Sequence, residues 1–160
     1  MTRPNSGVCA WRRWNASRRH LAPTRKTIAQ TTVEAVAARI GSAGADSFIP
    51  GALRRGKFVG MAGFHRELEM KSRNKWRVWG VYVTEAARGF GIGRELMARL
   101  IERARGERGL VQIMLTVTTE QVAPRRLYES FGFVSFGREP RALQVDGRYL
   151  DEDYYVLRLA

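Results

Sequence analysis

The chain has 160 residues and a mass of 18.2 kDa, the size of one compact domain. Its 44% hydrophobic and 27% charged residues are ordinary globular composition, which excludes a fibrous or a wholly disordered protein. No stretch approaches the roughly 18 apolar residues of a membrane span, and a single cysteine, Cys9, excludes an intramolecular disulfide and a cysteine-built zinc site. Because no apolar signal core follows the first arginines, we expect a cytoplasmic protein.

The net charge of +13 is concentrated at the N-terminus, where the first 33 residues contain seven basic residues and no acidic one. These are Arg3, Arg12, Arg13, Arg18, Arg19, Arg25 and Lys26. A basic arm with Trp11 and Trp14 available for stacking indicates one function class, a nucleic-acid binding module. We favour an irregular or disordered tail, since residues 1–26 show neither the helical nor the strand period.

From Thr27 onwards the pattern becomes that of a folded domain. Val33, Val36, Ala37 and Ile40 predict one face of an amphipathic helix that ends at Gly41. Segments 47–52 and 57–67 predict two strands, which Arg54, Arg55 and Gly56 join as a hairpin.

The central part of the chain predicts a strand, a glycine-rich turn and a helix. Segment 76–83 is rich in β-branched and aromatic residues at successive positions, which favours a central strand covered on both faces. Segment 84–93 contains three glycines. The helix that follows has one apolar stripe, formed by Leu96, Met97, Leu100, Ile101 and Ala104, and ends at Gly106.

The C-terminal third adds a buried strand at 112–117 and a helix at 122–130, where Pro124 fits because it lies in the first turn. Segments 133–136 and 153–159 predict the last two strands, separated by a loop whose hairpin signal is Asp146 followed by glycine. The order strand, helix, strand, helix, strand predicts a layered α/β or α+β fold with parallel neighbours in the middle.

A glycine-rich turn between a strand and a helix is the clearest chemical signal. Arg88 to Arg94 read R-G-F-G-I-G-R. Glycines let several backbone N–H groups point at one spot, and the helix dipole adds positive potential, so the turn predicts a pyrophosphate site. The alternative is a plain structural turn. The dinucleotide-binding fingerprint fails, because Arg94 stands where its third glycine belongs.

A second motif, L-Y-E-S-F-G-F at Leu127 to Phe133, closes the next helix. Together with Val83 to Gly93 it resembles the GNAT superfamily of acetyl-coenzyme A dependent N-acetyltransferases, over about residues 47–159. The resemblance implies a single-domain α+β fold, a mixed and mostly antiparallel sheet flanked by helices whose central parallel strands splay to admit acetyl-coenzyme A. We expect a GNAT domain at 27–160 that transfers acetyl from this co-substrate to a primary amine.

The resemblance also implies roles for particular residues. Cofactor contacts are expected at Val81, Tyr82, Val83, Arg88, Gly89, Phe90, Gly91, Ile92, Gly93 and Arg94. The backbone of 81–83 would pair with the pantetheine arm, and the Val83 N–H would bind the oxyanion. Tyr128 would be the general acid for the departing thiolate, because a phenol pKa of about 10 suits an alkyl thiolate. The alternative is that Tyr128 only packs beneath its helix.

Two departures from the family pattern affect the site. Gln121 stands where many members have an asparagine that contacts the cofactor, and Pro124 replaces a helix former. Thr116 stands where ribosomal-protein alanine acetyltransferases have a glutamate base, which argues against a peptide N-terminus as acceptor. The candidate base is Glu120, followed by Glu85 and Glu67; all three also fit solvated surface carboxylates.

The acidic segment 145–154 resembles the last hairpin of GNAT enzymes that acetylate amino acids and similar amines, or is simply a polar hairpin. We therefore expect a small-molecule amine as partner. A homodimer is compatible with the family, and no membrane or nucleic-acid partner is expected. His20 and His65 lack ligand partners at metal spacing, so no metal is expected.

Residues 1–26 lack the strand and helix with which GNAT chains begin. Read one base earlier, the codons of Ala10 to Ala22 can encode a peptide that resembles the family's first helix, so a frameshift before Thr27 is one hypothesis for this segment. A third functional alternative follows, a GNAT fold that binds coenzyme A but no longer catalyses.

Overall fold

The computed structural model describes residues 47–159. Four expectations lie outside these residues: the amphipathic helix at 33–40, the basic arm, the domain boundary after residue 26 and the frameshift hypothesis.

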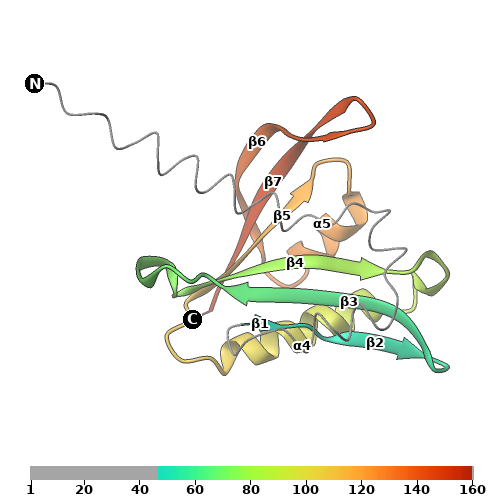
Figure 1. Cartoon of the computed structure of the whole chain (residues 1–160), viewed down its shortest axis with the longest axis horizontal. Helices are drawn as coiled ribbons and strands as arrows, with labels where there is room; N and C mark the ends of the chain where they lie inside the picture. Colours follow the sequence, from blue (N-terminus) through green and yellow to red (C-terminus); the bar gives the residue numbers. More distant parts are fainter. Residues whose placement is uncertain (1–46, 160) are drawn as a thin grey trace, which may run out of the picture.

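The described residues form one seven-stranded mixed sheet with two α-helices (Figure 1). The strands are β1 Ser47–Phe48, β2 Gly51–Arg54, β3 Lys57–Arg66, β4 Lys75–Val83, β5 Gln112–Thr118, β6 Val134–Val145 and β7 Arg148–Arg158. The helices are α4 Ile92–Arg105 and α5 Val122–Glu129, with short 3-10 turns η1 Met70–Ser72 and η2 Glu85–Ala87.

The sheet has the order β1-β3-β4-β5-β7-β6, and β2 pairs with β3 beside β1. Among the described strands only β4 and β5 run parallel. Helix α4 connects them and packs on β3 and β4 (Figure 1). The expected mixed, mostly antiparallel α+β sheet is confirmed.

The core lies between α4 and the sheet. The buried residues of α4 are the five predicted ones, Leu96, Met97, Leu100, Ile101 and Ala104. Strands β3, β4 and β5 contribute the facing side chains, Ala62, Phe64, Trp76, Val78, Ile113, Leu115 and Val117. The apolar face of α4, which repeats every 3.6 residues, therefore packs in one core with the apolar face of β5, which repeats every two residues.

The predicted strand 47–52 is wrong as a single element. It is divided into β1 and β2 at Ile49 and Pro50, because proline has no N–H to donate to a ladder. The Pro50 carbonyl still accepts a hydrogen bond from the Ala62 N–H at 3.1 Å. The hairpin that follows is confirmed: Arg55 (φ 51°) and Gly56 (φ 74°) both adopt the left-handed conformation that a two-residue turn requires.

The C-terminal hairpin is longer than predicted. Its turn at Asp146 (φ 49°) and Gly147 (φ 79°) is confirmed, but β6 and β7 are continuous strands where a long loop was expected between short ones. The register of β6 shifts between Ser135 and Gly137 and again between Glu139 and Leu143. Each shift is a bulge that interrupts the two-residue period, so the pattern of β6 does not indicate a strand over its full length.

Candidate active site

Strands β4 and β5 separate along their length. They pair only at their beginnings, at Lys75 with Gln112, Trp76 with Ile113 and Arg77 with Met114. Beyond these positions the two parallel strands have no pairing in the described structure, and they diverge towards their C-terminal ends (Figure 1). The C-terminal half of β4 therefore presents its β5-facing backbone edge without a strand partner, an edge that an extended ligand can join.

A bulge in β4 changes which side chains of the strand face α4. Gly63 pairs with Trp79 whereas Met61 pairs with Tyr82, so two β4 residues lie opposite one β3 residue, and Gly80 has a φ of 61°. Up to this point Trp76 and Val78 face the core; after it, Val81 and Val83 pack against the core instead. The predicted burial of β4 on both faces is not observed within residues 47–159, where Trp76 and Val78 are its only buried residues.

The backbone N–H of Val83 points into the gap between the strands. The Thr84 N–H donates to the Val59 carbonyl of β3 at 2.9 Å. Because successive N–H groups of an extended chain point to opposite edges, the Val83 N–H faces the β5 side. That is the position a donor needs if it is to stabilise an anion formed between the strands.

The glycine turn leads directly from β4 into α4. Gly89 (φ 81°) and Gly91 (φ 76°) both adopt the left-handed conformation, and a Cβ added to either would meet no atom within 4 Å. Gly91 is the N-cap of α4, so the N–H groups of the first helical turn, starting at Ile92, lie beside this open space. An uncovered backbone at a helix N-terminus suits a diphosphate.

Gly93 allows α5 to pack closely against this loop. A Cβ at Gly93 would lie 3.4 Å from the Leu127 side chain and 3.8 Å from that of Val83. The structure thereby brings together the end of β4, the first turn of α4 and helix α5, which carry most of the predicted site.

The two arginines of the motif direct their side chains back to the protein. Arg88 donates to the Val83 carbonyl at 3.3 Å and pairs with Glu85 at 3.4 Å. Arg94 donates to the Ser130 hydroxyl at 2.9 Å and lies 5.2 Å from the Phe131 ring centre. The loop therefore presents its backbone to a ligand, and these side chains fix the loop.

Tyr128 lies on α5 and is buried, with 6% of its surface exposed. Its ring packs edge-on against Phe133 at 6.0 Å between centres. Burial raises the pKa of Tyr128 to about 12, above the ordinary value of about 10 used for the sequence prediction. The phenol consequently stays protonated at neutral pH, as a proton donor must.

The three candidate bases lie at different places. Glu120 follows β5 and pairs with Arg148 at 3.3 Å, and both side chains are exposed. Glu85 pairs with Arg88 and is 90% exposed. Glu67 hydrogen-bonds to Lys75 through its backbone, at the start of β4, and lies at the opposite end of that strand from Val83. The structure therefore does not bring Glu67 to the gap between the strands.

Gln121 is the N-cap residue of α5 and makes no side-chain capping bond. Thr116 is half-buried on β5 and pairs in register with Tyr154 of β7. Neither position supplies a carboxylate, so β5 carries no acid at Thr116, where the sequence resemblance implies a glutamate base for acetylation of a peptide N-terminus.

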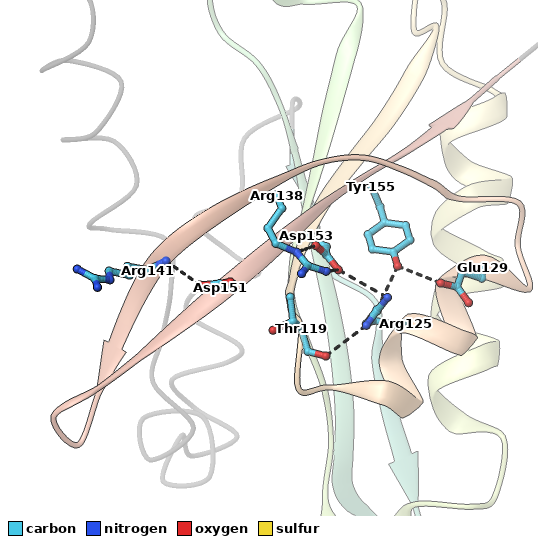
Figure 2. Close-up of polar contacts among 8 residues, drawn as sticks. All are labelled: Thr119, Arg125, Glu129, Arg138, Arg141, Asp151, Asp153 and Tyr155. Carbon is cyan, nitrogen blue, oxygen red and sulfur yellow. Dashed lines mark hydrogen bonds and ion pairs between the residues drawn. The ribbon is translucent and has the colours of Figure 1, made fainter.

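A polar network that the sequence did not reveal joins α5 to the last two strands (Figure 2). The Tyr155 hydroxyl accepts a hydrogen bond from Arg125 Nε at 3.2 Å and donates to Glu129 at 3.0 Å. Arg125 also lies 3.6 Å from Asp153, whose carboxylate accepts two bonds from Arg138 at 2.7 and 3.2 Å. Arg138, and then Arg125, hold the pKa of Asp153 below its ordinary value although burial acts in the opposite direction.

This network changes the interpretation of the acidic C-terminal segment. Asp153 is 3% exposed and paired with arginines, and Asp151 accepts the Arg141 N–H at 2.8 Å. Glu139 accepts a hydrogen bond from the Tyr154 hydroxyl. These three carboxylates bind groups of the hairpin itself. They are therefore not free to attract a cationic amine.

Within residues 47–159, no group of three or more histidine, cysteine, aspartate or glutamate side chains converges as a metal site. In the same part of the chain, no helix is long and apolar enough to cross a membrane.

Comparison with known proteins agrees with this geometry. The model of the acetyltransferase (GNAT) family matches residues 11–133. An L-methionine sulfoximine/L-methionine sulfone acetyltransferase of Pseudomonas aeruginosa is 37% identical over 79 residues, 49% of this chain and 45% of the relative. The N-alpha-acetyltransferase RimI of Mycobacterium tuberculosis is 37% identical over 108 residues, 68% of this chain and 63% of the relative. The matches thus span less than two thirds of these relatives.

Solved structures show the same fold. The ribosomal-protein-alanine N-acetyltransferase of Brucella melitensis has a TM-score of 0.64 at 34% identity and covers 69% of this chain and 68% of its own. The YncA protein of Salmonella typhimurium, solved with its cofactor acetyl-CoA, has a TM-score of 0.65 at 29% identity and covers 70% of this chain and 64% of its own. Since the family model covers more than half of the sequence, and the splayed strands and glycine turn are in place, the chain belongs to the GNAT acetyltransferase family.

Proposed function

We propose that this protein transfers the acetyl group of acetyl-CoA to the primary amine of a small molecule, with amino acids as the acceptor class. The observation that carries the proposal is the unpaired C-terminal half of β4 leading directly into an open glycine turn at the N-terminus of α4. One extended ligand with a diphosphate fits both features at once.

The residues of the site suit acetyl-CoA. The backbone edge at 81–83 would bind the pantetheine amides, as a further strand does. The N–H groups from Gly89 to Arg94 would bind the diphosphate, including those of Phe90, Ile92 and Gly93, because the left-handed glycines leave the loop uncovered. The bound co-substrate supplies an activated acetyl thioester.

The acceptor amine attacks the thioester carbonyl carbon directly. A carbon–nitrogen bond forms, the carbon–sulfur bond breaks, and the Val83 N–H stabilises the negative charge that develops on the carbonyl oxygen. Tyr128 donates its proton to the leaving sulfur, and the proton that the attacking nitrogen loses as the amide forms restores the Tyr128 phenol. The ammonium proton of the acceptor must be removed before attack, and Glu120 is our candidate base, since it lies on the turn between β5 and α5.

The acceptor class is inferred from the relatives and from one residue. Matching relatives include acetyltransferases named for L-methionine sulfoximine and L-methionine sulfone and an L-amino acid N-acyltransferase, as well as enzymes named for ribosomal-protein alanine and N-alpha acetylation. The absence of a carboxylate at Thr116 favours the amino acid group over the protein N-terminus.

The first test of the proposal is calorimetric titration of the full chain with acetyl-CoA. We expect micromolar binding that Gly91→Val weakens at least tenfold, because a β-branched residue resists a φ of 76° and fills the open loop. Gly147→Val is the matched control, since Gly147 has the same left-handed backbone and the same open surroundings but lies in the β6–β7 hairpin. No binding by folded wild-type protein would reject the cofactor site.

Turnover then separates an active enzyme from a fold that only binds. L-methionine sulfone, L-methionine sulfoximine and a peptide with N-terminal alanine are offered as acceptors, and thiol release is followed. We expect the amino acids to react and Tyr128→Phe to lower kcat about 100-fold with little change in KM for acetyl-CoA. Binding without turnover of any acceptor would favour the inactive alternative, and unchanged kcat in Tyr128→Phe would reject the proton-donor role.

A further inference from the structure

An arginine from a distant hairpin lies beside the glycine loop. Arg54 is the last residue of β2, and its guanidinium carbon lies 3.8 Å from the centre of the Phe90 ring. Phe90 stands between the left-handed glycines Gly89 and Gly91, and 61% of its surface is exposed. The β2–β3 hairpin thus places a positive charge next to the open backbone of the loop.

The geometry of this contact leaves the donors of Arg54 available. A guanidinium that lies over an aromatic ring uses its flat face, whereas its five N–H groups point outwards in its plane. No carboxylate pairs with Arg54 among the described residues. The ring therefore holds the cation in place without neutralising it.

The other two arginines at the loop are engaged elsewhere. Arg88 is hydrogen-bonded to the Val83 carbonyl and paired with Glu85. Arg94 donates to Ser130. Among the arginines that contact this loop within residues 47–159, Arg54 is the one whose guanidinium N–H groups make no hydrogen bond or ion pair. Two N–H groups that lie side by side in one plane are the arrangement that binds phosphate oxygens best.

We propose that Arg54, held by Phe90, is a ligand for the phosphate oxygens of the nucleotide co-substrate. This inference rests on the proposed function and deepens it, since the loop backbone and the Arg54 guanidinium would bind the same diphosphate-bearing ligand. Phe90 then has two roles: its N–H belongs to the loop, and its ring is the platform that orients Arg54.

The test compares two adjacent arginines by calorimetric titration of the full chain with acetyl-CoA. Arg54→Gln and Arg55→Gln remove the same charge from the same hairpin, and only Arg54 is in contact with Phe90. We expect Arg54→Gln to weaken binding about tenfold and Arg55→Gln less than twofold. At 0.5 M salt the difference should shrink, because an exposed charge is screened. Arg54→Lys should weaken binding by an intermediate factor, since it keeps the charge and lacks the planar donors.

A double-mutant cycle tests the platform. In a Phe90→Leu background, Arg54→Gln should weaken binding less than threefold, because the guanidinium is no longer oriented. Thermal unfolding of each variant shows that the fold is retained. Equal affinities of Arg54→Gln and Arg55→Gln would overturn the inference while leaving the proposed function intact. Failure of folded wild-type protein to bind acetyl-CoA would overturn both.

Discussion

Replacing Tyr128 with phenylalanine should change how the stability of this protein depends on alkaline pH. Burial raises the pKa of the Tyr128 phenol to about 12 in the folded state, against about 10 in the unfolded chain. The folded protein therefore binds more protons than the unfolded chain between these two values. It follows that the stabilising contribution of this phenol is complete below pH 10 and is lost as the pH rises through 12.

The size of the effect follows from the shift. Two pKa units correspond to about 3 kcal/mol of unfolding free energy in total, of which about 1 kcal/mol is lost at pH 11. Tyr128→Phe keeps the ring that packs on Phe133 and removes the ionisable group. Within the described residues no hydrogen bond to the Tyr128 hydroxyl is formed, so the variant should be close to wild type in stability at pH 7.

Urea unfolding of both proteins at intervals from pH 7 to pH 11 measures this difference. Every other titrating group is shared, so subtraction isolates the Tyr128 phenol. Wild-type protein should lose about 1 kcal/mol more than the variant by pH 11. Parallel curves would mean that the phenol titrates normally in the folded state, and the argument that burial keeps it protonated would then be wrong.

Three further substitutions test the polar network at Tyr155, the contact between Gly63 and Trp79, and the burial of His65. Tyr155→Phe removes the hydroxyl that donates to Glu129 and accepts from helix α5, and should lower the unfolding free energy by about 1–2 kcal/mol, measured by urea denaturation. Gly63→Ala places a Cβ 2.5 Å from a ring carbon of Trp79, so we expect the unfolding free energy to fall by about 1–3 kcal/mol in the same assay. Unchanged stability would refute this packing argument. Burial lowers the pKa of His65, so the unfolded chain binds more protons and the stability of the wild-type protein should fall as the pH drops below about 6.5. The His65→Gln variant should lose less stability between pH 7 and pH 5, as measured by thermal unfolding at the two pH values.

Several elements were predictable because their signals are local. The apolar stripe of α4 needs only a 3.6-residue period, and the turns at Arg55-Gly56 and Asp146-Gly147 need only residues that accept a left-handed backbone. The glycine turn from Arg88 to Gly93 was recognised for the same reason, since its shape depends on a backbone conformation that glycine permits.

The features that were missed are interruptions of a pattern. The bulge in β4 exchanges the faces of Val81 and Val83, and its only sequence signal is a glycine at position 80 within an apolar strand. Two register shifts conceal the length of β6. A period of two residues identifies a strand only while pairing is regular, so each bulge removes the signal on which the prediction depends.

The sequence by itself determined the family, the order of the elements from β3 onwards and the residues of the glycine loop, because these depend on neighbours along the chain and on two motifs at a characteristic spacing. Only the tertiary structure decided how the polar groups are paired. Arg54 meets Phe90 across 36 residues, and Tyr155 meets Arg125 across 30. Burial of Tyr128 sets its pKa, and arginines from two elements neutralise Asp153. Charge pairing and desolvation act between side chains that the fold brings together, and no local pattern in the chain specifies those partners.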